Sequence, residues 1–249
     1  MESLVEDLPP LKTRPMDAIR STIDSPNWGQ NLLWLSIAVL LQSVFVGQIA
    51  LLGWGSEVIE RRSGLPGRPT HDVNPDRIGD YIQSGIWPFI VSFVVQIAVT
   101  VLMLIPMFFL VLAFLAASAA GEAAAGFAVA IMIPLAFLFS VALMTLTVPF
   151  VLNAMICQEF SKALDIGWAR HFVSIMFWEV IVSGVVYYLL SLVVLLCGFL
   201  LLCVGYIPAT AMVTGGAMHM LSQWYEIFLQ RGGRPIEPAG GQIVDATII

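Results

Sequence analysis

The sequence predicts an all-α protein: a bundle of about five transmembrane helices, joined by short amphipathic helices that lie at the membrane surface. The first observation is a set of long apolar runs with almost no charge, because a helix needs about 20 residues to cross a bilayer. The second is composition, since 59% of the 249 residues are hydrophobic and only 11% are charged. A water-soluble surface needs far more charge than this. The runs cover residues 32–54, 87–117, 123–152 and 172–225, and the last is long enough to cross twice.

The charged residues and cysteines exclude several classes of function. The net charge is −6, but the acidic residues are scattered along the chain, and the sequence has no basic stripe for nucleic acid. The three cysteines form no C-x-x-C pair, so we interpret them as small buried hydrophobic residues. No nucleotide-binding, serine-hydrolase or zinc-protease motif occurs. We therefore expect no cofactor, no metal ion and no nucleic-acid partner.

The chain divides into one membrane domain with a tail at each end. Residues 15–230 are expected to form the transmembrane helical domain. Residues 1–14 and 231–249 are expected to be flexible tails. Mixed charges near the N-terminus, without an apolar segment among them, argue against a signal peptide.

The N-terminal elements are predicted to be a surface helix and the first span. Residues 13–23 have the pattern of a short amphipathic helix on the membrane surface, with Thr13 as its N-cap. Trp28 and Trp34 mark the membrane interface. The first span then runs to about Gly53.

The segment 54–86 is the largest polar part of the chain. Glycines and prolines make its middle irregular. Asn74 and Pro75 then start a second amphipathic helix. His71 lies beside acidic residues here, which we interpret as a solvated loop and not as a metal site. The apolar face of the second amphipathic helix is formed by Ile78, Tyr81, Ile82 and Ile86.

The remaining spans follow from the other runs. Pro106 lies in the second span and Pro134 in the third, where neighbouring helices re-satisfy the freed carbonyl groups. Small residues between positions 116 and 126 predict a tight helical hairpin. Residues 157–165 are amphipathic and precede the fourth span. Residues 205–208, with Gly and Pro, divide the final run into the fourth and fifth spans.

Lysine and arginine positions leave two topologies open, because positive residues favour the cytoplasmic side. With five full spans, eight of the eleven Lys and Arg residues lie on the same side of the membrane as the C-terminus. The other three lie on the opposite side, together with the N-terminus. If the first run turns back as a re-entrant hairpin, all eleven share one side. We favour five spans, because 23 residues are too few for two crossings. The turn of the alternative would contain Gln42, Ser43, Gly47 and Gln48.

Five polar residues in or near the apolar runs are candidates for a functional site. Glu179 stands alone in a long apolar run, and an ionisable group inside a membrane is costly. A hydrogen bond with Gln96 is a structural alternative for this carboxyl group. His219, Gln223 and Glu226 share one helical face, although a helix end leaving the bilayer gives the same pattern.

Several short motifs resemble one set of bacterial and archaeal membrane proteins, the domain of unknown function 4013 family. The resemblance covers roughly residues 15–230, and the chain departs from the family pattern at Arg68–Arg77, where an acidic cluster is interrupted. It implies architecture and no activity. The motifs are Leu52-Gly53-Trp54, the charged helix Glu57–Arg62, Gly64-Leu65-Pro66, Ser84-Gly85, Ala163-Leu164-Asp165 before Trp168, Gly205-Tyr206-Ile207-Pro208, and His219 with Gln223-Trp224-Tyr225.

The leading functional hypothesis is a non-enzymatic integral membrane protein that organises lipid or a partner, as an accessory subunit of a bacterial inner membrane. Its partners would be the lipid bilayer and a membrane protein, or further copies of the same chain. The alternative is a small-solute or ion transporter, or a channel-like protein, that uses Glu179 and His219. An intramembrane enzyme ranks third, because no nucleophile–base pair is visible.

Overall fold

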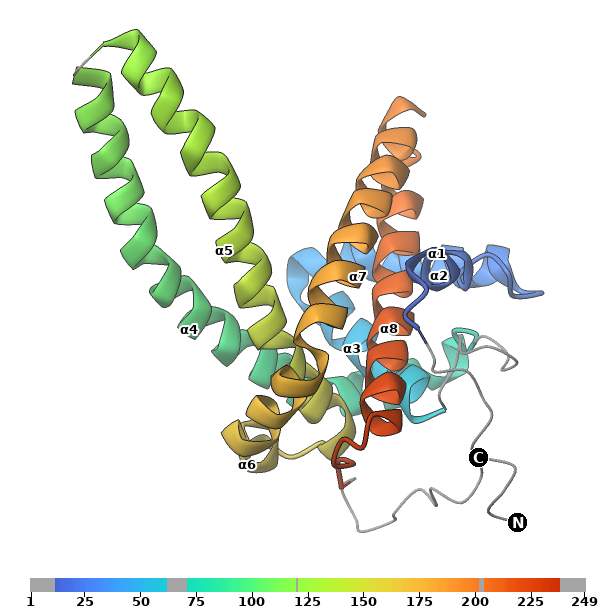
Figure 1. Cartoon of the computed structure of the whole chain (residues 1–249). Coiled ribbons are helices and arrows are strands. Elements are labelled where there is room, and N and C mark those ends of the chain that lie inside the picture. The colour runs from blue at the N-terminus through green and yellow to red at the C-terminus, as the bar shows by residue number, and fades with distance from the viewer. Residues whose placement is uncertain (1–11, 62–70, 120, 202–203, 238–249) are drawn as a thin grey trace.

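The computed structural model describes residues 12–61, 71–119, 121–201 and 204–237, and these residues form helices and turns without a strand. The predicted all-α class is therefore confirmed (Figure 1). In chain order the helices are α1 (Pro15–Arg20), α2 (Trp28–Leu40), η2 (Leu41–Val44), α3 (Val46–Glu60), η3 (Pro75–Arg77), α4 (Ile78–Ala119), α5 (Glu122–Cys157), α6 (Phe160–Ala163), α7 (Ile166–Leu200) and α8 (Tyr206–Gln230).

Three of the described helical segments are long and apolar enough to cross a membrane, where the sequence predicted about five. They are Pro75–Ala119, Glu122–Cys157 and Phe160–Leu200, which contain α4, α5 and α7. These segments indicate that the protein associates with a membrane. The tight hairpin predicted between the second and third runs is present, because α4 ends at Ala119 and α5 begins at Glu122.

The first apolar run is two helices and not one continuous span. Helices α2 and α3 are joined by the 3₁₀ turn η2 and by Phe45, whose φ of 64° is left-handed and ends the helical path. Gly47 lies against the end of α2 so closely that an added Cβ would be 1.8 Å from the Ala38 carbonyl oxygen. The break lies where the alternative topology placed its turn.

The N-terminal segment lies beside the C-terminal end of α8. The Thr13 hydroxyl donates to one carboxylate oxygen of Glu179 at 2.7 Å, and Arg231 donates to the other at 2.6 Å. A hydrocarbon core about 30 Å thick cannot separate two groups that bind the same carboxylate. The five-span topology, with the N-terminus opposite the C-terminus, does not fit this contact, and the alternative with all cations on one side does.

The same contact corrects the predicted cap of the first helix. The residue at the N-cap of α1 is Arg14, and no side chain caps the helix. The hydroxyl of Thr13 instead donates a hydrogen bond to Glu179. Helix α1 is therefore anchored by packing on α7 and α8, where its Ala18 and Ile19 are buried.

Helix α8 is the centre of the bundle and packs against α1, α2, α3 and α7. Two glycines allow these close approaches. An added Cβ at Gly216 would lie 3.0 Å from the Ala18 carbonyl oxygen, and one at Gly215 would lie 3.1 Å from Leu35. Small residues are common where membrane helices approach closely. Towards its C-terminal end, α8 adds Phe228, which has no exposed surface and packs against aromatic rings of α7.

The α4–α5 hairpin projects from this bundle, as the green helices of Figure 1 show. Residues 101–119 of α4 and 122–136 of α5, called the arm below, include no buried residue. The arm ends near the contact between Phe137 of α5 and Tyr188 of α7, whose rings are 6.3 Å apart. The most apolar helices of the chain are thus the least covered by protein.

Candidate functional site

The strongest cluster of charged side chains lies where α3 crosses the start of α4. The crossing depends on two glycines that let the backbones touch. An added Cβ at Gly53 would be 1.8 Å from the Tyr81 carbonyl oxygen, and one at Gly85 would be 1.8 Å from that of Ile49. This contact brings the last turn of α3, which carries Glu57, against the first turn of α4.

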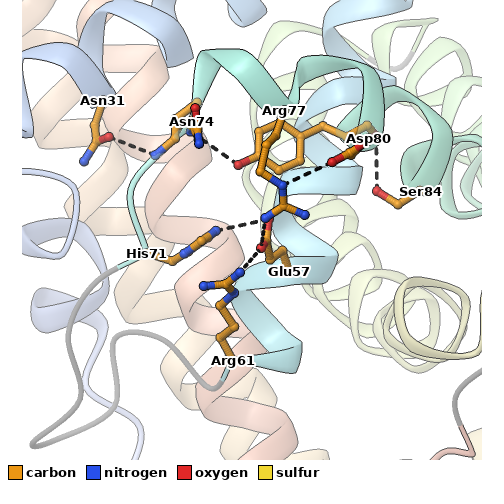
Figure 2. A network of polar contacts seen from close by, with 10 residues as sticks. Asn31, Glu57, Arg61, His71, Asn74, Arg77, Asp80 and Ser84 are labelled. Carbon is orange, nitrogen blue, oxygen red and sulfur yellow. Dashed lines mark hydrogen bonds and ion pairs between the residues drawn. The ribbon is translucent and has the colours of Figure 1, made fainter. Parts of the chain in front are cut away.

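Glu57 is the centre of an ion network (Figure 2). Its carboxylate pairs with Arg61 at 2.5 Å, with His71 Nε2 at 3.2 Å, and with Arg77. Arg77 also donates to Asp80 at 3.1 Å. Arg61 is the C-cap residue of α3, while His71 and Arg77 come from the far end of the polar segment. The network therefore ties both ends of this segment to α3.

Burial and charge act in opposite directions on Glu57. Burial raises the pKa of its carboxyl group, but the hydrogen bond from Arg77 and the charges of His71 and Arg61 outweigh it, so the pKa lies below its ordinary value. Burial also lowers the pKa of His71, against the attraction of Glu57. At neutral pH Glu57 is thus a carboxylate paired with two guanidinium groups, and the imidazole beside it is neutral.

A second carboxylate, Asp72, fixes the same segment to the corner between α1 and α2. It accepts hydrogen bonds from Ser25, from Asn27 at 2.8 Å and from Asn31 at 2.6 Å. Burial raises the pKa of Asp72, but the hydrogen bonds from Ser25, Asn31 and Asn27 outweigh burial, so the pKa lies below its ordinary value. The backbone of Val73 donates to Asn31 at 2.9 Å, which completes the tie.

A polar cavity of about 310 Å³ adjoins the network. Its walls include both cations of the cluster and three carboxyl groups, so it suits a small, strongly hydrated or zwitterionic group. Among the residues that the structure describes, no group of three or more His, Cys, Asp or Glu side chains is placed to hold a metal ion. The cavity is lined by Gly53, Ser56, Glu57, Glu60, Arg61, Arg77, Asp80, Tyr81 and Ser84.

The candidate residues from the sequence fall in other parts of the fold. Glu179 and Gln223 hold the same N-terminal segment, since Gln223 accepts from the Arg14 backbone at 2.8 Å. His219 is buried with its ring 5.9 Å from that of Trp54, and Glu226 is buried on the same helix. Gln96 is exposed on α4 and is not among the described partners of Glu179.

Sequence reasoning missed the network around Glu57 and took His71 as a solvated loop residue. The pair of Glu57 and Arg61 could be read directly, because residues four apart share a helical face. The contributions of His71 and Arg77 could not, since they depend on how the intervening segment closes.

The fold and this network define a helical membrane-associated protein whose charged cluster lies at one end of its bundle. The chain belongs to the family described as "Protein of unknown function (DUF4013)", whose model matches residues 36–203. This confirms the resemblance found in the sequence, over a shorter range. No curated protein and no solved structure matches the chain. The match begins inside α2 and ends after α7.

Proposed function

We propose that this protein is a non-enzymatic, multi-pass accessory protein of a bacterial inner membrane that organises lipid or a partner membrane protein along its arm. The observation that carries the proposal is the exposure of the arm, where Phe109 and Ile133 are 63% and 66% exposed. Apolar side chains at such exposure are costly in water, at about 25 cal/mol per Å². Surfaces of this kind mark contacts with a membrane or a partner.

Site-specific photocrosslinking tests the proposal. A photoreactive residue placed at Phe109 or at Ile133 should give the same discrete adduct in intact membranes, of either a protein or a lipid. Leu189 on α7 is a matched control, because it is also exposed and apolar but lies outside the arm. If the arm positions give only the heterogeneous lipid adducts of the control, an organising role for the arm is refuted.

The orientation in the membrane is part of the proposal. The sequence has no Lys or Arg between Arg77 and Lys162 or between Arg170 and Arg231. Those stretches contain the α4–α5 and α7–α8 turns, so the positive-inside rule favours the opposite end as cytoplasmic. In a cysteine-free variant, Ser118→Cys should react with an impermeant thiol reagent on intact cells and Ser161→Cys only after lysis. The reverse pattern would overturn this orientation.

The transport alternative has weaker support. Glu179 is held by Thr13 and Arg231, and this suits an ion pair that joins helices better than a carboxylate that exchanges protons or cations. His219 is packed against Trp54 in the centre of the bundle.

A further inference from the structure

The polar cavity beside Glu57 presents charges of both signs that an occupant can reach. Its walls contain two guanidinium groups and three carboxyl groups, so the acidic side chains outnumber the basic ones by one. These groups are accessible, since 58% of the Arg61 side chain and 66% of the Asp80 side chain are exposed. An anion alone would face an excess of negative charge here, whereas an occupant that also carries a cationic group meets partners of both signs.

The two guanidinium groups offer donors for the anionic part of an occupant. They lie next to each other, because both contact Oε1 of Glu57 (Figure 2). Their contacts with described residues use Nη2 of Arg61, and Nη1 and Nε of Arg77. A guanidinium group has five N–H donors, so those on Nε and Nη1 of Arg61 and on Nη2 of Arg77 remain for a ligand. Because the fork of a guanidinium group matches phosphate oxygens in geometry, these donors suit a phosphate.

Glu60 is the carboxyl group of the cavity that suits a cation. Glu57 is paired with both arginines and Asp80 is paired with Arg77, but no ion pair joins Glu60 to another described residue. Burial and the charge of Glu57 raise the pKa of Glu60, against the attraction of Arg61. A cationic group beside this carboxylate would offset the repulsion from Glu57.

The cavity lies at the level of the lipid headgroups. Ser84 lines it on α4, only three residues before Trp87, or about 4.5 Å along the helix. Trp87 and its neighbour Ile86 are exposed, and tryptophan side chains concentrate at the membrane interface. The polar layer on each side of the hydrocarbon is about 5–7 Å thick. The cavity is therefore within reach of the headgroup of a lipid whose chains lie beside Ile86.

The lining also restricts the kind of cation and the size of the occupant. A primary ammonium group has three N–H donors that carboxylates accept. Quaternary ammonium groups are instead bound by cages of aromatic rings, and Tyr81 is the sole aromatic residue among the described residues that line this cavity. The volume of about 310 Å³ is at the lower end of small-molecule sites, about 300–1,000 Å³, so it suits a headgroup and not a whole lipid.

We propose that this cavity binds the phosphoethanolamine headgroup of a bilayer phospholipid, with its phosphate on Arg61 and Arg77 and its ammonium group on Glu60. The phosphate oxygens accept from the remaining guanidinium N–H groups, and the ammonium group donates to the Glu60 carboxylate. The acyl chains leave the cavity beside Ile86 and enter the hydrocarbon. The cavity is outside the arm, so this inference does not depend on what the arm binds.

Native mass spectrometry of the full chain, freed of its own lipids in detergent, tests the proposal by titration with phospholipids that have identical acyl chains. Phosphatidylethanolamine should bind about 10-fold more tightly than phosphatidylcholine, which is the effect of one charge-assisted hydrogen bond. Equal affinity for the two lipids in the unmodified protein would overturn the proposal, and this comparison requires no variant to fold. Glycerophosphoethanolamine, the same headgroup without chains, should bind more weakly than the lipid. If it binds as tightly, the headgroup chemistry stands and the bilayer is not its source.

Two variants separate the two halves of the headgroup. Glu60→Gln should bind both lipids equally, because the partner of the ammonium group is lost. Arg61→Gln should weaken both lipids alike and keep their ratio, because both contain the phosphate. Glu122→Gln and Arg170→Gln are the matched controls, since both side chains are exposed outside the cavity, and they should change neither affinity nor ratio. A preference for phosphatidylethanolamine that survives Glu60→Gln unchanged would refute this site.

Discussion

The close crossing of α3 and α4 makes Gly53→Ala a sharp test of the fold. Cβ contacts are ordinary at 3.4 Å or more, and the added Cβ would lie 1.8 Å from the Tyr81 carbonyl oxygen. The two helices must therefore move apart by about 1.6 Å. Because the obstructing atom belongs to the main chain, it cannot rotate away. Overpacking of this kind costs about 1–3 kcal/mol, and this site lies at the upper end of that range.

Helix propensity offsets part of this cost. Alanine is favoured over glycine in a helix interior by about 1 kcal/mol. The expected net loss of stability is therefore about 2 kcal/mol, or roughly a 30-fold larger unfolded fraction. Gly85→Ala should behave alike, and the double variant should cost little more than either single one, because one separation of the helices accommodates both methyl groups.

The assay uses the buried thiol of Cys157, which is 1% exposed. In a background with the other two cysteines replaced by serine, a thiol-reactive fluorophore reports unfolding as the protein is heated in detergent. Gly126→Ala is the control, since nothing lies within 4 Å of its added Cβ. It should be neutral or stabilising by up to about 1 kcal/mol. If Gly53→Ala and Gly126→Ala shift the transition in the same direction, the close crossing is not a determinant of this fold.

Three further predictions use the same thiol assay. Phe228→Ala should cost about 3–5 kcal/mol, because this ring has no exposed surface; a loss below about 1 kcal/mol would contradict its place in the core. Glu179→Gln should cost at most about 1 kcal/mol, since its ion pair with Arg231 is partly exposed; a larger loss would show that the pair is desolvated. Acidification should destabilise the fold in two steps. The pKa of His71 is lowered on folding, so stability falls as the pH drops below its ordinary value of 6.5. The pKa of Glu57 is also lowered, so the stability from its carboxylate is lost as the pH falls below 4.5 towards its folded value. His71→Gln should remove only the upper step, and an unchanged upper step would assign it to another group.

The helices α4, α5 and α7 could be predicted because run length and hydropathy are local properties. The break in the first run is expected only in the alternative topology, from Gln42, Ser43, Gly47 and Gln48. Its exact position at Phe45 has no local signal, because this residue is neither glycine nor proline. The ion-pair partner of Glu179, Arg231, could have been predicted from the sequence. Helix α7 ends at Leu200, and α8 begins at Tyr206 and packs against it. Positions equally far from these two ends therefore lie side by side, and Arg231 lies within about one helical turn of the position opposite Glu179.

Only part of the Glu57 network could be predicted from the sequence, for a related reason. A helix fixes the spacing of Glu57 and Arg61, whereas His71 and Arg77 reach Glu57 through the closure of a segment whose course no local pattern fixes. Asp72 illustrates the same limit, because its three donors belong to residues more than 40 positions earlier in the chain. Contacts of such separation are decided by packing, and the decisive packing here is the backbone contact at Gly53 and Gly85.

Burial and hydropathy are inversely related along this chain, and this bears on the medium around it. Helix α4 is the most apolar candidate span, yet no residue of its most apolar window is buried. Helix α8 contains His219, Gln223 and Glu226, yet all three are buried. Water would favour the opposite arrangement, because exposed apolar surface is costly there and uncovered polar groups are not. Hydrocarbon reverses both costs, so the polar helix is enclosed by protein and the apolar arm faces outward. The exposure of α4 and the burial of the polar groups of α8 thus indicate a membrane around the arm, independently of helix length and of the family match.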